Sequence, residues 1–364
     1  MNKKERIRNA LTFKKVDRIP VYDLLHQPDV IGHYSGYNIS RDFPSSQKWQ
    51  IVTTAIRNSL DGTRCLQVPE KPREIETENG FLYEVQEWTS WLKKRPFEDV
   101  SGAKTFVQTK VEKEEGGISG HSVLTSSFPE GGTLELMEML DKTPWIMESC
   151  AALDEARNTL GPRLFYLLYD KEPELVSNWL DILLRRSIKR VEEWDRGAKE
   201  KGMKLKDLFP AALTYTDLAN NRTTLSSPEF LRKEFFPRLK KLNDVWHSYD
   251  VKCIFHSDGN LEEVLGDLVR TGIDGLNPLD FLVDPYSDMD FETIRKKYPR
   301  LALVGGIESR RLLRNGSVEE VESEIKRIVN IVGRRGLILG STTELDPGVD
   351  PENAIKMIET IKKV

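Results

Sequence analysis

Short apolar segments that alternate with helical segments are the feature that most constrains the fold of this 364-residue chain. Eight of them, bounded by turn residues, have the character of buried strands. They cover residues 18–22, 123–127, 163–169, 208–216, 251–256, 273–277, 301–305 and 337–340. Strands that alternate with helices favour a parallel sheet, and eight of them favour its closure into a barrel. We therefore expect an α/β protein that folds as a single (β/α)8 TIM barrel over residues 1–364.

Three segments between the strands have the apolar spacing of helices, namely 174–194, 227–246 and 318–332. The second opens with Ser227-Pro228-Glu229 and the third follows Ser317, which are favourable helix starts. Residues 67–120 do not fit this alternation, because 80–94 alternates with a period of two. We interpret 67–120 as an inserted β-hairpin region after the first strand. A two-domain chain with a break near 105–120 is the alternative.

The charge balance excludes several classes of partner. The chain has 54 basic and 58 acidic residues and no long basic run, so neither nucleic acid nor an anionic membrane surface is expected. No apolar run approaches the ~20 residues of a membrane span, and the charged first residues lack an apolar signal segment. Cys65, Cys150 and Cys253 are widely spaced and predict neither a disulfide framework nor a Cys-x-x-Cys zinc site. These features predict a cytoplasmic protein.

Polar side chains follow nearly every predicted strand. The carboxyl ends of parallel barrel strands open onto one common mouth, so we expect these side chains to gather there. They include Asp23, Asp217, His256, Asp258, Asn277, Asp280, Glu308, Thr343 and Glu344. Most of those that ionise are acidic. Such a mouth suits a cationic centre, which could be a divalent metal, a protonated substrate or a positively charged transition state.

The turn His256-Ser257-Asp258-Gly259 is the centre of this prediction. His256 could be a ligand or an acid–base group, or a structural histidine that caps a loop, and Asp258 could simply begin an Asx turn. Asp217 follows an apolar run, where an unpaired carboxylate would be costly, so a metal, a base or a tight polar network is favoured. We take Asp217, His256, Asp258, Asn277 and Glu308 as candidate catalytic residues.

Two other chemistries have no support in the sequence. No glycine-rich phosphate loop opens a helix, which argues against a nucleotide site. The Gly-x-Ser-x-Gly elbow of serine hydrolases is also missing.

Several motifs together resemble the uroporphyrinogen decarboxylase superfamily. Those motifs are Val16-Asp17-Arg18-Ile19-Pro20, Ser227-Pro228-Glu229-Phe230, His256-Ser257-Asp258-Gly259-Asn260, Gly305-Gly306-Ile307-Glu308 and Asp350-Pro351-Glu352-Asn353. The resemblance spans nearly the whole chain and is strongest from 205 to 360. It implies a barrel with one of two chemistries, which are cofactor-free decarboxylation of a porphyrinogen and methyl transfer involving a corrinoid or thiol, often with zinc.

The chain departs from both patterns at important positions. The cationic stretch of the decarboxylases is replaced by Asp23-Leu24-Leu25-His26-Gln27, without an arginine, and the histidine expected after the last strand aligns with Thr343. An acidic mouth also has the wrong sign for a polycarboxylate substrate. The cysteines of the thiol-type zinc methyltransferases align with Asp258 and Thr343.

The chain is more similar to the ether-cleaving methyltransferases of O-demethylase systems, which implies zinc held by two carboxylates and a histidine. Asp217, Glu234 and His256 could be such a set, and Glu344, Asp258 or Glu308 could equally complete it. The metal would act as a Lewis acid on the ether oxygen. A separate partner protein would carry the corrinoid, because this chain has no corrinoid-binding Asp-x-His-x-x-Gly motif.

We therefore expect a methyltransferase that takes a methyl group from a small ether- or amine-type substrate. The alternative is a cofactor-free decarboxylase or lyase with Asp and His acid–base groups and no bound metal. A non-catalytic barrel that captures a cationic small molecule is a third reading. A homodimer is an option because barrels of this size often dimerise.

Overall fold

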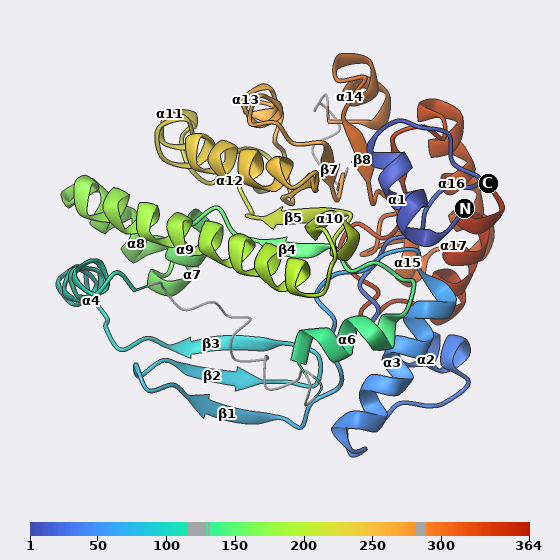
Figure 1. Cartoon of the computed structure of the whole chain (residues 1–364), viewed down its shortest axis with the longest axis horizontal. Coiled ribbons are helices and arrows are strands. Elements are labelled where there is room, and N and C mark those ends of the chain that lie inside the picture. The colour runs from blue at the N-terminus through green and yellow to red at the C-terminus, as the bar shows by residue number, and fades with distance from the viewer. Residues whose placement is uncertain (116–128, 130–131, 281–288) are drawn as a thin grey trace.

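A computed structural model describes residues 1–115, 129, 132–280 and 289–364 (Figure 1). Its centre is a sheet of six parallel strands in sequence order. These are β4 (Met147–Ser149), β5 (Ala211–Tyr215), β6 (Lys252–His256), β7 (Gly275–Asn277), β8 (Ala302–Val304) and β9 (Leu337–Ile338). The predicted α/β class with a parallel sheet is confirmed, and the last five predicted strands contain β5 to β9.

Isolated parallel bridges continue the sheet past both of its edge strands. Val21 pairs with Leu339, directly after β9, and Tyr22 pairs with Gly62. Thr63 then pairs with Trp145, two residues before β4. Segments 21–22 and 62–63 thus connect one edge of the sheet to the other, and the arrangement is barrel-like.

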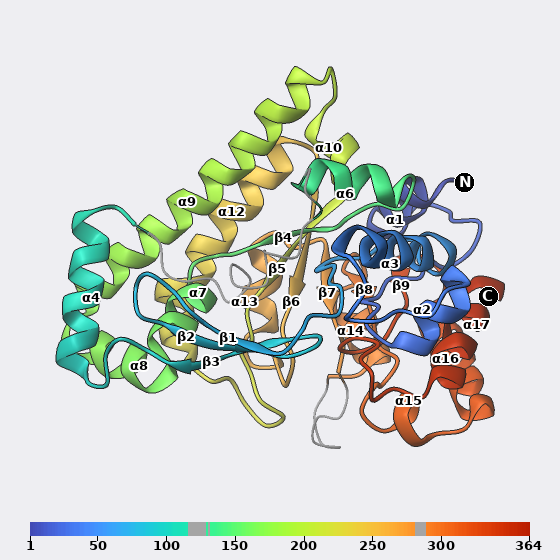
Figure 2. The same ribbon diagram turned by 90° about the horizontal axis from the view of Figure 1, so that it is seen from below.

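Helices surround this sheet, and the long helices α9 and α12 run side by side along it (Figure 2). The helices are α1 (Lys3–Leu11), α2 (Pro28–Ser35), α3 (Ser45–Ser59), α4 (Val100–Glu112), α6 (Gly132–Leu140), α7 (Leu153–Leu160), α8 (Pro162–Lys171), α9 (Pro173–Glu200), α10 (Leu205–Leu208), α11 (Pro228–Phe230), the π-helical turn η2 (Leu231–Phe235), α12 (Phe236–Ser248), α13 (Leu265–Arg270), α14 (Phe291–Lys297), α15 (Leu312–Asn315), α16 (Val318–Val332) and α17 (Pro351–Lys363). The three predicted helical segments are confirmed, and Ser317 caps α16 as expected. None of the described helices is both long enough and apolar enough to cross a membrane.

A small antiparallel sheet lies within 67–120, in the order β1 (Arg73–Glu76), β2 (Leu82–Val85) and β3 (Ser90–Lys94). It confirms the predicted period-two segment, although three strands are present instead of a single hairpin. We predicted this insertion after the first strand. It instead follows segment 62–63, which is the second strand segment of the barrel-like sheet. Trp88, between β2 and β3, stacks on His26 with ring centres 5.5 Å apart. The insertion therefore contacts the loop that follows strand segment 21–22.

The predicted strand at 163–169 is wrong, because these residues form α8. A short apolar run does not distinguish a strand from a buried helix. Here Pro162 stands in the first helical turn, and Phe165 and Leu168, three residues apart, are the buried side chains. The third strand is instead β4, whose few residues carry no strong apolar pattern. The predicted strand at 123–127 lies outside the described residues.

Strand side chains alternate between two hydrophobic cores. Leu213 of β5 and Ile254 of β6 pack in an inner core with Ile7 and Leu11 of α1. Their neighbours in the strands, including Phe255, belong to the outer core beneath the helices. Leu11 lies against Gly275, the first residue of β7. Helix α1 therefore fills the interior of the barrel-like sheet, which we call the ring, at the amino ends of the strands. Side chains two residues beyond Leu213 and Ile254 therefore point inward at the opposite, carboxyl end.

A buried ion-pair network fastens α1 to the strand segments. The Asp61 carboxylate is fully buried and accepts hydrogen bonds from Arg6 Nη1 and Arg18 Nη1, each at 2.6 Å. It also accepts the backbone N–H of Val21 at 2.9 Å, which holds the first strand segment beside the second.

Replacing this carboxylate should destabilise the whole fold. We expect Asp61→Asn to lower the free energy of unfolding by about 3–5 kcal/mol, because it removes the fully buried negative charge that Arg18 and Arg6 share, and Arg6 keeps only Asp17. Urea denaturation followed by circular dichroism measures this loss. Asp17→Asn, which removes the half-exposed partner of Arg6, is the control and should cost clearly less. A loss below about 1 kcal/mol for Asp61→Asn would contradict the assigned role.

Candidate active site

Three neighbouring strands bring Tyr215, His256 and Asn277 into one row. Tyr215 is paired with His256 between β5 and β6, and His256 is paired with Asn277 between β6 and β7. The strands are parallel and in register, so the three side chains project from the same end of the sheet. The alternation of inner and outer positions directs Tyr215 and His256 inward. Their rings stack with centres 4.8 Å apart.

Asn277 determines which nitrogen of His256 is available. The Asn277 amide donates to the carbonyl of Val304 at 3.1 Å, so its Oδ1 faces Nδ1 of His256 at 2.5 Å as an acceptor. Nδ1 must then carry the proton, and Nε2 keeps a lone pair. Burial, assisted by the positive charge of Arg64, lowers the pKa of His256 to about 4. The imidazole is therefore neutral at neutral pH and presents a free nitrogen ligand.

Two carboxylates lie beside this nitrogen. Asp258 Oδ1 is 3.9 Å from His256 Nε2. Asp217 accepts the hydroxyl of Tyr215 at 2.8 Å through one oxygen and the backbone N–H of Asp258 at 3.2 Å through the other. One ligand atom from each of Asp217, His256 and Asp258 lies within 4.8 Å of the other two. Asn277 joins this group through its contact with His256. The structure therefore brings together Asp217, His256, Asp258 and Asn277, which are four of the five candidate catalytic residues.

Gly259 allows the two loops to meet. Its φ is +85°, and a Cβ at this position would lie 2.5 Å from the carbonyl oxygen of Asn220. The backbone N–H of Asn260 donates to that carbonyl at 2.8 Å. The turn after β6 is therefore pressed against the loop after β5, which sets Asp258 next to Asp217.

Asp258 has the properties of an unsatisfied ligand. Oδ1 is buried and has no hydrogen-bond partner among the described residues. Burial, together with the negative charges of Asp217 and Asp280, raises the pKa of Asp258 to about 7. A buried acceptor without a donor is unfavourable, and a cation between Asp258 and His256 would relieve both effects. Nitrogen and oxygen ligands of this kind fit zinc with an open fourth position.

Arg64 is a further residue of this end of the ring that the sequence analysis missed. It follows segment 62–63, is only 7% exposed, and donates through Nη1 to Glu148 at 2.8 Å. Its guanidinium carbon lies 5.9 Å from the centre of the Tyr215 ring. The mouth is therefore not purely acidic. The only sequence signal was a short Gly62-Thr63 step after α3, too brief to identify as a strand.

Glu234, one of the implied metal ligands, is engaged elsewhere. Its carboxylate accepts hydrogen bonds from Tyr169 at 2.9 Å, Ser177 at 2.9 Å and Arg238 at 2.8 Å. Burial works to raise the pKa of Glu234, but these three hydrogen bonds and the Arg238 charge outweigh it, and the pKa is lowered. The residue forms a buried link between η2, α8 and α9 and is not part of the Asp217–His256–Asp258 group.

The other two predicted glutamates are also separate from this group. Glu308 accepts the backbone N–H groups of Arg310, Arg311 and Leu312 at 2.7–3.0 Å, which is a structural role at the start of α15. Glu344 lies 3.3 Å from Nδ1 of His26. Burial works to raise the pKa of Glu344, but the hydrogen bond and charge of His26 outweigh it, and the pKa is lowered.

A second group of metal-compatible atoms comprises His247, Cys253 and Asp274. Here Asp274 already accepts Lys252 Nζ at 3.1 Å, and His247 Nε2 lies 2.7 Å from it. Burial raises the pKa of Cys253 well above its usual range, so the sulfur stays a thiol. Because its acceptors are satisfied and a lysine is already bound, this group suits a metal less well than the first.

The C-terminal part of the chain matches a known family. Residues 210–364 match the model of uroporphyrinogen decarboxylase (URO-D). The matched region begins directly before β5 and contains Asp217, His256, Asp258 and Asn277. The resemblance seen in the sequence is confirmed. No curated protein sequence matches the chain significantly.

Solved structures extend the similarity to the whole chain. A methyltransferase from Methanosarcina mazei has a TM-score of 0.68 and 17% identity, and the alignment covers 100% of this chain and 99% of that protein. A B12-independent methionine synthase from Shewanella has a TM-score of 0.46 and 12% identity, with 94% and 96% covered. At this level of identity the similarity to the methyltransferase concerns the fold.

The protonation of Asp258 can be measured directly. We expect its carboxyl carbon to titrate near pH 7 in the metal-free protein, and at lower pH in Asp217→Asn, because that variant removes a neighbouring negative charge. Carbon-13 NMR of aspartate-labelled protein, with Asp258→Asn to assign the resonance, measures both values. A midpoint near the ordinary value of about 4 would show that Asp258 is solvated and not held as described.

Proposed function

We propose that this protein is a methyltransferase that moves a methyl group from a small ether- or amine-type substrate to a corrinoid carried by a separate protein. A zinc ion at Asp217, His256 and Asp258 would assist the transfer. One observation carries this proposal: Oδ1 of Asp258 is buried without a hydrogen-bond partner among the described residues, and it lies 3.9 Å from Nε2 of His256. The match of residues 210–364 to the uroporphyrinogen decarboxylase model and the similarity in fold to a methyltransferase support it.

The ligand set proposed here differs from the one that the resemblance implies. It keeps Asp217 and His256 and takes Asp258 as the second carboxylate. Glu234 is omitted because its oxygens are satisfied by Tyr169, Ser177 and Arg238. Glu344 is omitted because it pairs with His26.

Each residue has a distinct task in this proposal. Asn277 keeps the proton of His256 on Nδ1, so that Nε2 remains a ligand. Tyr215 donates its hydroxyl to Asp217 and stacks on His256, and thereby fixes the direction of both groups. Zinc, when bound, would supply Lewis-acid stabilisation of the ether oxygen or amine nitrogen that the methyl group leaves. The small-molecule substrate would enter at the carboxyl ends of the strands, because α1 fills the other end.

A cofactor-free lyase is the second candidate, and the pKa of Asp258 favours it. A carboxyl group with a pKa of about 7 can both donate and accept a proton near neutral pH, which is what general acid–base catalysis needs. The two functions differ in whether activity requires the metal. The lyase keeps its activity after chelation, whereas the methyltransferase loses it and transfers methyl groups only to a corrinoid.

Metal analysis distinguishes them. We expect about one zinc per chain after loading and dialysis, measured by plasma mass spectrometry, because three N/O ligands with an open position suffice for zinc. His256→Ala should lose the metal, and Asp258→Asn should bind it at least about tenfold more weakly. His247→Ala is the matched control, because it removes the histidine of the second group, and it should retain the zinc.

Zinc that is absent from the loaded wild-type protein, or lost only in His247→Ala, would refute the proposed site. Methyl transfer is then followed as the disappearance of Co(I) absorbance when zinc-loaded protein and cob(I)alamin receive a panel of methyl ethers and methylamines. Turnover that persists after chelation, without a corrinoid, would favour the lyase.

A further inference from the structure

Arg64 makes few contacts for a buried arginine. Among the described residues, the only hydrogen bond of its guanidinium runs from Nη1 to Glu148 at 2.8 Å. Nε is buried and has no hydrogen-bond partner among these residues. The edge formed by Nε and Nη2 therefore carries N–H groups that the described chain does not satisfy, and a buried donor without an acceptor is unfavourable.

Other arginines of this chain show what this edge binds. Arg6 donates from Nε and Nη2 to the two oxygens of Asp17, at 2.7 and 2.8 Å, while its Nη1 donates to Asp61. Arg327 uses the same two nitrogens for both oxygens of Glu324. Two parallel N–H groups match the planar geometry of a carboxylate. A guanidinium can thus bind a second carboxylate through its Nε–Nη2 edge while Nη1 is engaged.

A second donor without a partner lies beside Arg64. Tyr22 is bridged to Gly62, two residues before Arg64, and its hydroxyl is buried without a hydrogen-bond partner among the described residues. Burial raises the pKa of Tyr22, and the positive charge of Arg64 works against this rise, so the two side chains are neighbours. Because the phenol keeps its proton, its hydroxyl can donate to an anion that also contacts Arg64.

This pair of side chains is close to the candidate active site. The guanidinium carbon of Arg64 lies 5.9 Å from the centre of the Tyr215 ring, which stacks on His256. Its positive charge assists burial in lowering the pKa of His256. A substrate that reacts beside His256 therefore has the guanidinium of Arg64 as a neighbour.

We infer that Arg64 and Tyr22 bind one carboxylate group of the substrate, through the Nε–Nη2 edge and the phenol hydroxyl. This inference rests on the proposed function and narrows its substrates to methyl ethers or methylamines that carry a single carboxylate. The side chains of Glu148, Asp217 and Glu344 belong to the same mouth, and their charges would repel a substrate with further carboxylates. Arg64 is therefore a substrate-binding residue that determines specificity.

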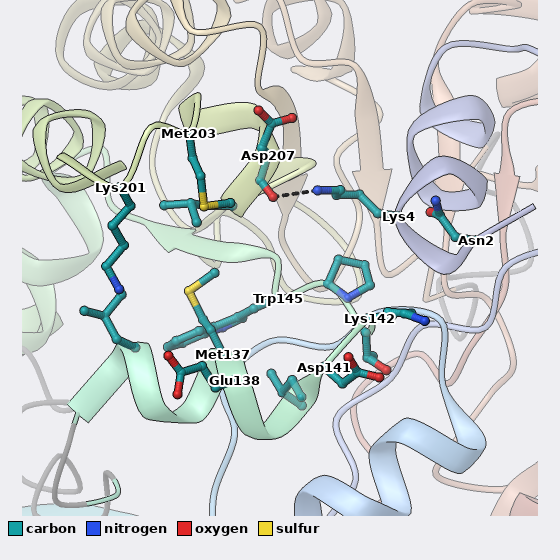
Figure 3. Close-up of a pocket in the computed structure, with 15 residues that line it drawn as sticks. Asn2, Lys4, Met137, Glu138, Asp141, Lys142, Trp145, Lys201, Met203 and Asp207 are labelled. Carbon is teal, nitrogen blue, oxygen red and sulfur yellow. Dashed lines mark hydrogen bonds between the residues drawn. The ribbon is translucent and has the colours of Figure 1, made fainter. Parts of the chain in front are cut away.

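The groove at the other end of the ring offers no comparable site. It has a volume of about 810 Å³ and lies at the amino ends of β4 and β5, where lysines and acidic side chains both line it (Figure 3). None of its described lining residues is an arginine, and Lys4 donates to the main-chain oxygen of Asp207 at 2.6 Å. An anion there would meet single ammonium groups, without the planar pair of donors that Arg64 presents.

Binding of a carboxylate at Arg64 can be measured without methyl transfer. We expect methoxyacetate, added to the metal-free full chain, to shift the Nε–H resonance of Arg64 in nitrogen-15 NMR of arginine-labelled protein. Arg64→Lys assigns this resonance, and the absence of metal excludes binding of the carboxylate to zinc. Methoxyacetamide has nearly the same shape without the charge and should leave the resonance in place. An equal shift with methoxyacetamide, or with inorganic phosphate, would overturn the selection for a carboxylate.

Substitutions test the geometry by isothermal titration calorimetry. Arg64→Lys keeps the positive charge but lacks the paired N–H groups, so it should raise the Kd of methoxyacetate by about tenfold or more. Tyr22→Phe removes one donor and should raise it less. Arg295→Lys is the matched control, because Nε of Arg295 also lacks a partner but its Nη2 donates to the main chain of Gly336, before β9. It should leave the Kd unchanged, and circular dichroism melting checks that each variant folds.

Methyl transfer separates this inference from the proposed function. Methoxy carboxylates of increasing chain length should have a higher kcat/KM than their carboxamides, and Arg64→Lys should reduce this preference by about tenfold. An Arg64 resonance that methoxyacetate does not move, or an equal loss in Arg295→Lys, would overturn the inference. Carboxylate binding at Arg64 without any methyl transfer would support the anion site and refute the proposed function. Methyl transfer without a preference for carboxylates would do the reverse.

Discussion

The in-register pairing of Tyr215, His256 and Asn277 across β5, β6 and β7 is the constraint on which the candidate active site depends. Parallel strands place equivalent positions side by side, so the three residues meet without any help from loop structure. A slip of β6 by one residue would turn His256 outward to the helices and Phe255 inward. The inner and outer hydrophobic cores both oppose such a slip, because each accepts only its own set of strand side chains.

The C-terminal part of the fold could be predicted because its strands are distinct. Residues 208–216 and 251–256 are apolar runs that end in polar residues, and periodicity identifies such runs well. The N-terminal part was harder, because segments 21–22 and 62–63 contribute only isolated bridges to the ring. Arg64 was missed for this reason, since its position is meaningful only once 62–63 is known to be part of the sheet.

The carboxylates show a second limit of sequence reasoning. Asp258, Glu234 and Glu308 all appeared suitable for a metal, and residue type does not separate them. Three donors satisfy Glu234, and backbone N–H groups satisfy Glu308. Oδ1 of Asp258 is buried without a donor among the described residues. The difference lies in which groups surround each oxygen, and those come from segments distant in sequence.

The bridge between Val21 and Leu339 has a consequence for how the chain is made. Its two residues are among the first and the last parts of this sequence to leave the ribosome. Translation adds about 5–20 residues per second, so the first segment waits many seconds for its neighbour in the ring. During that time α1 carries an apolar face, including Ile7 and Leu11, with no complete inner core to cover it. The N-terminal segment that forms the Val21–Leu339 bridge is therefore the part of this protein that a nascent-chain chaperone has the longest time to bind.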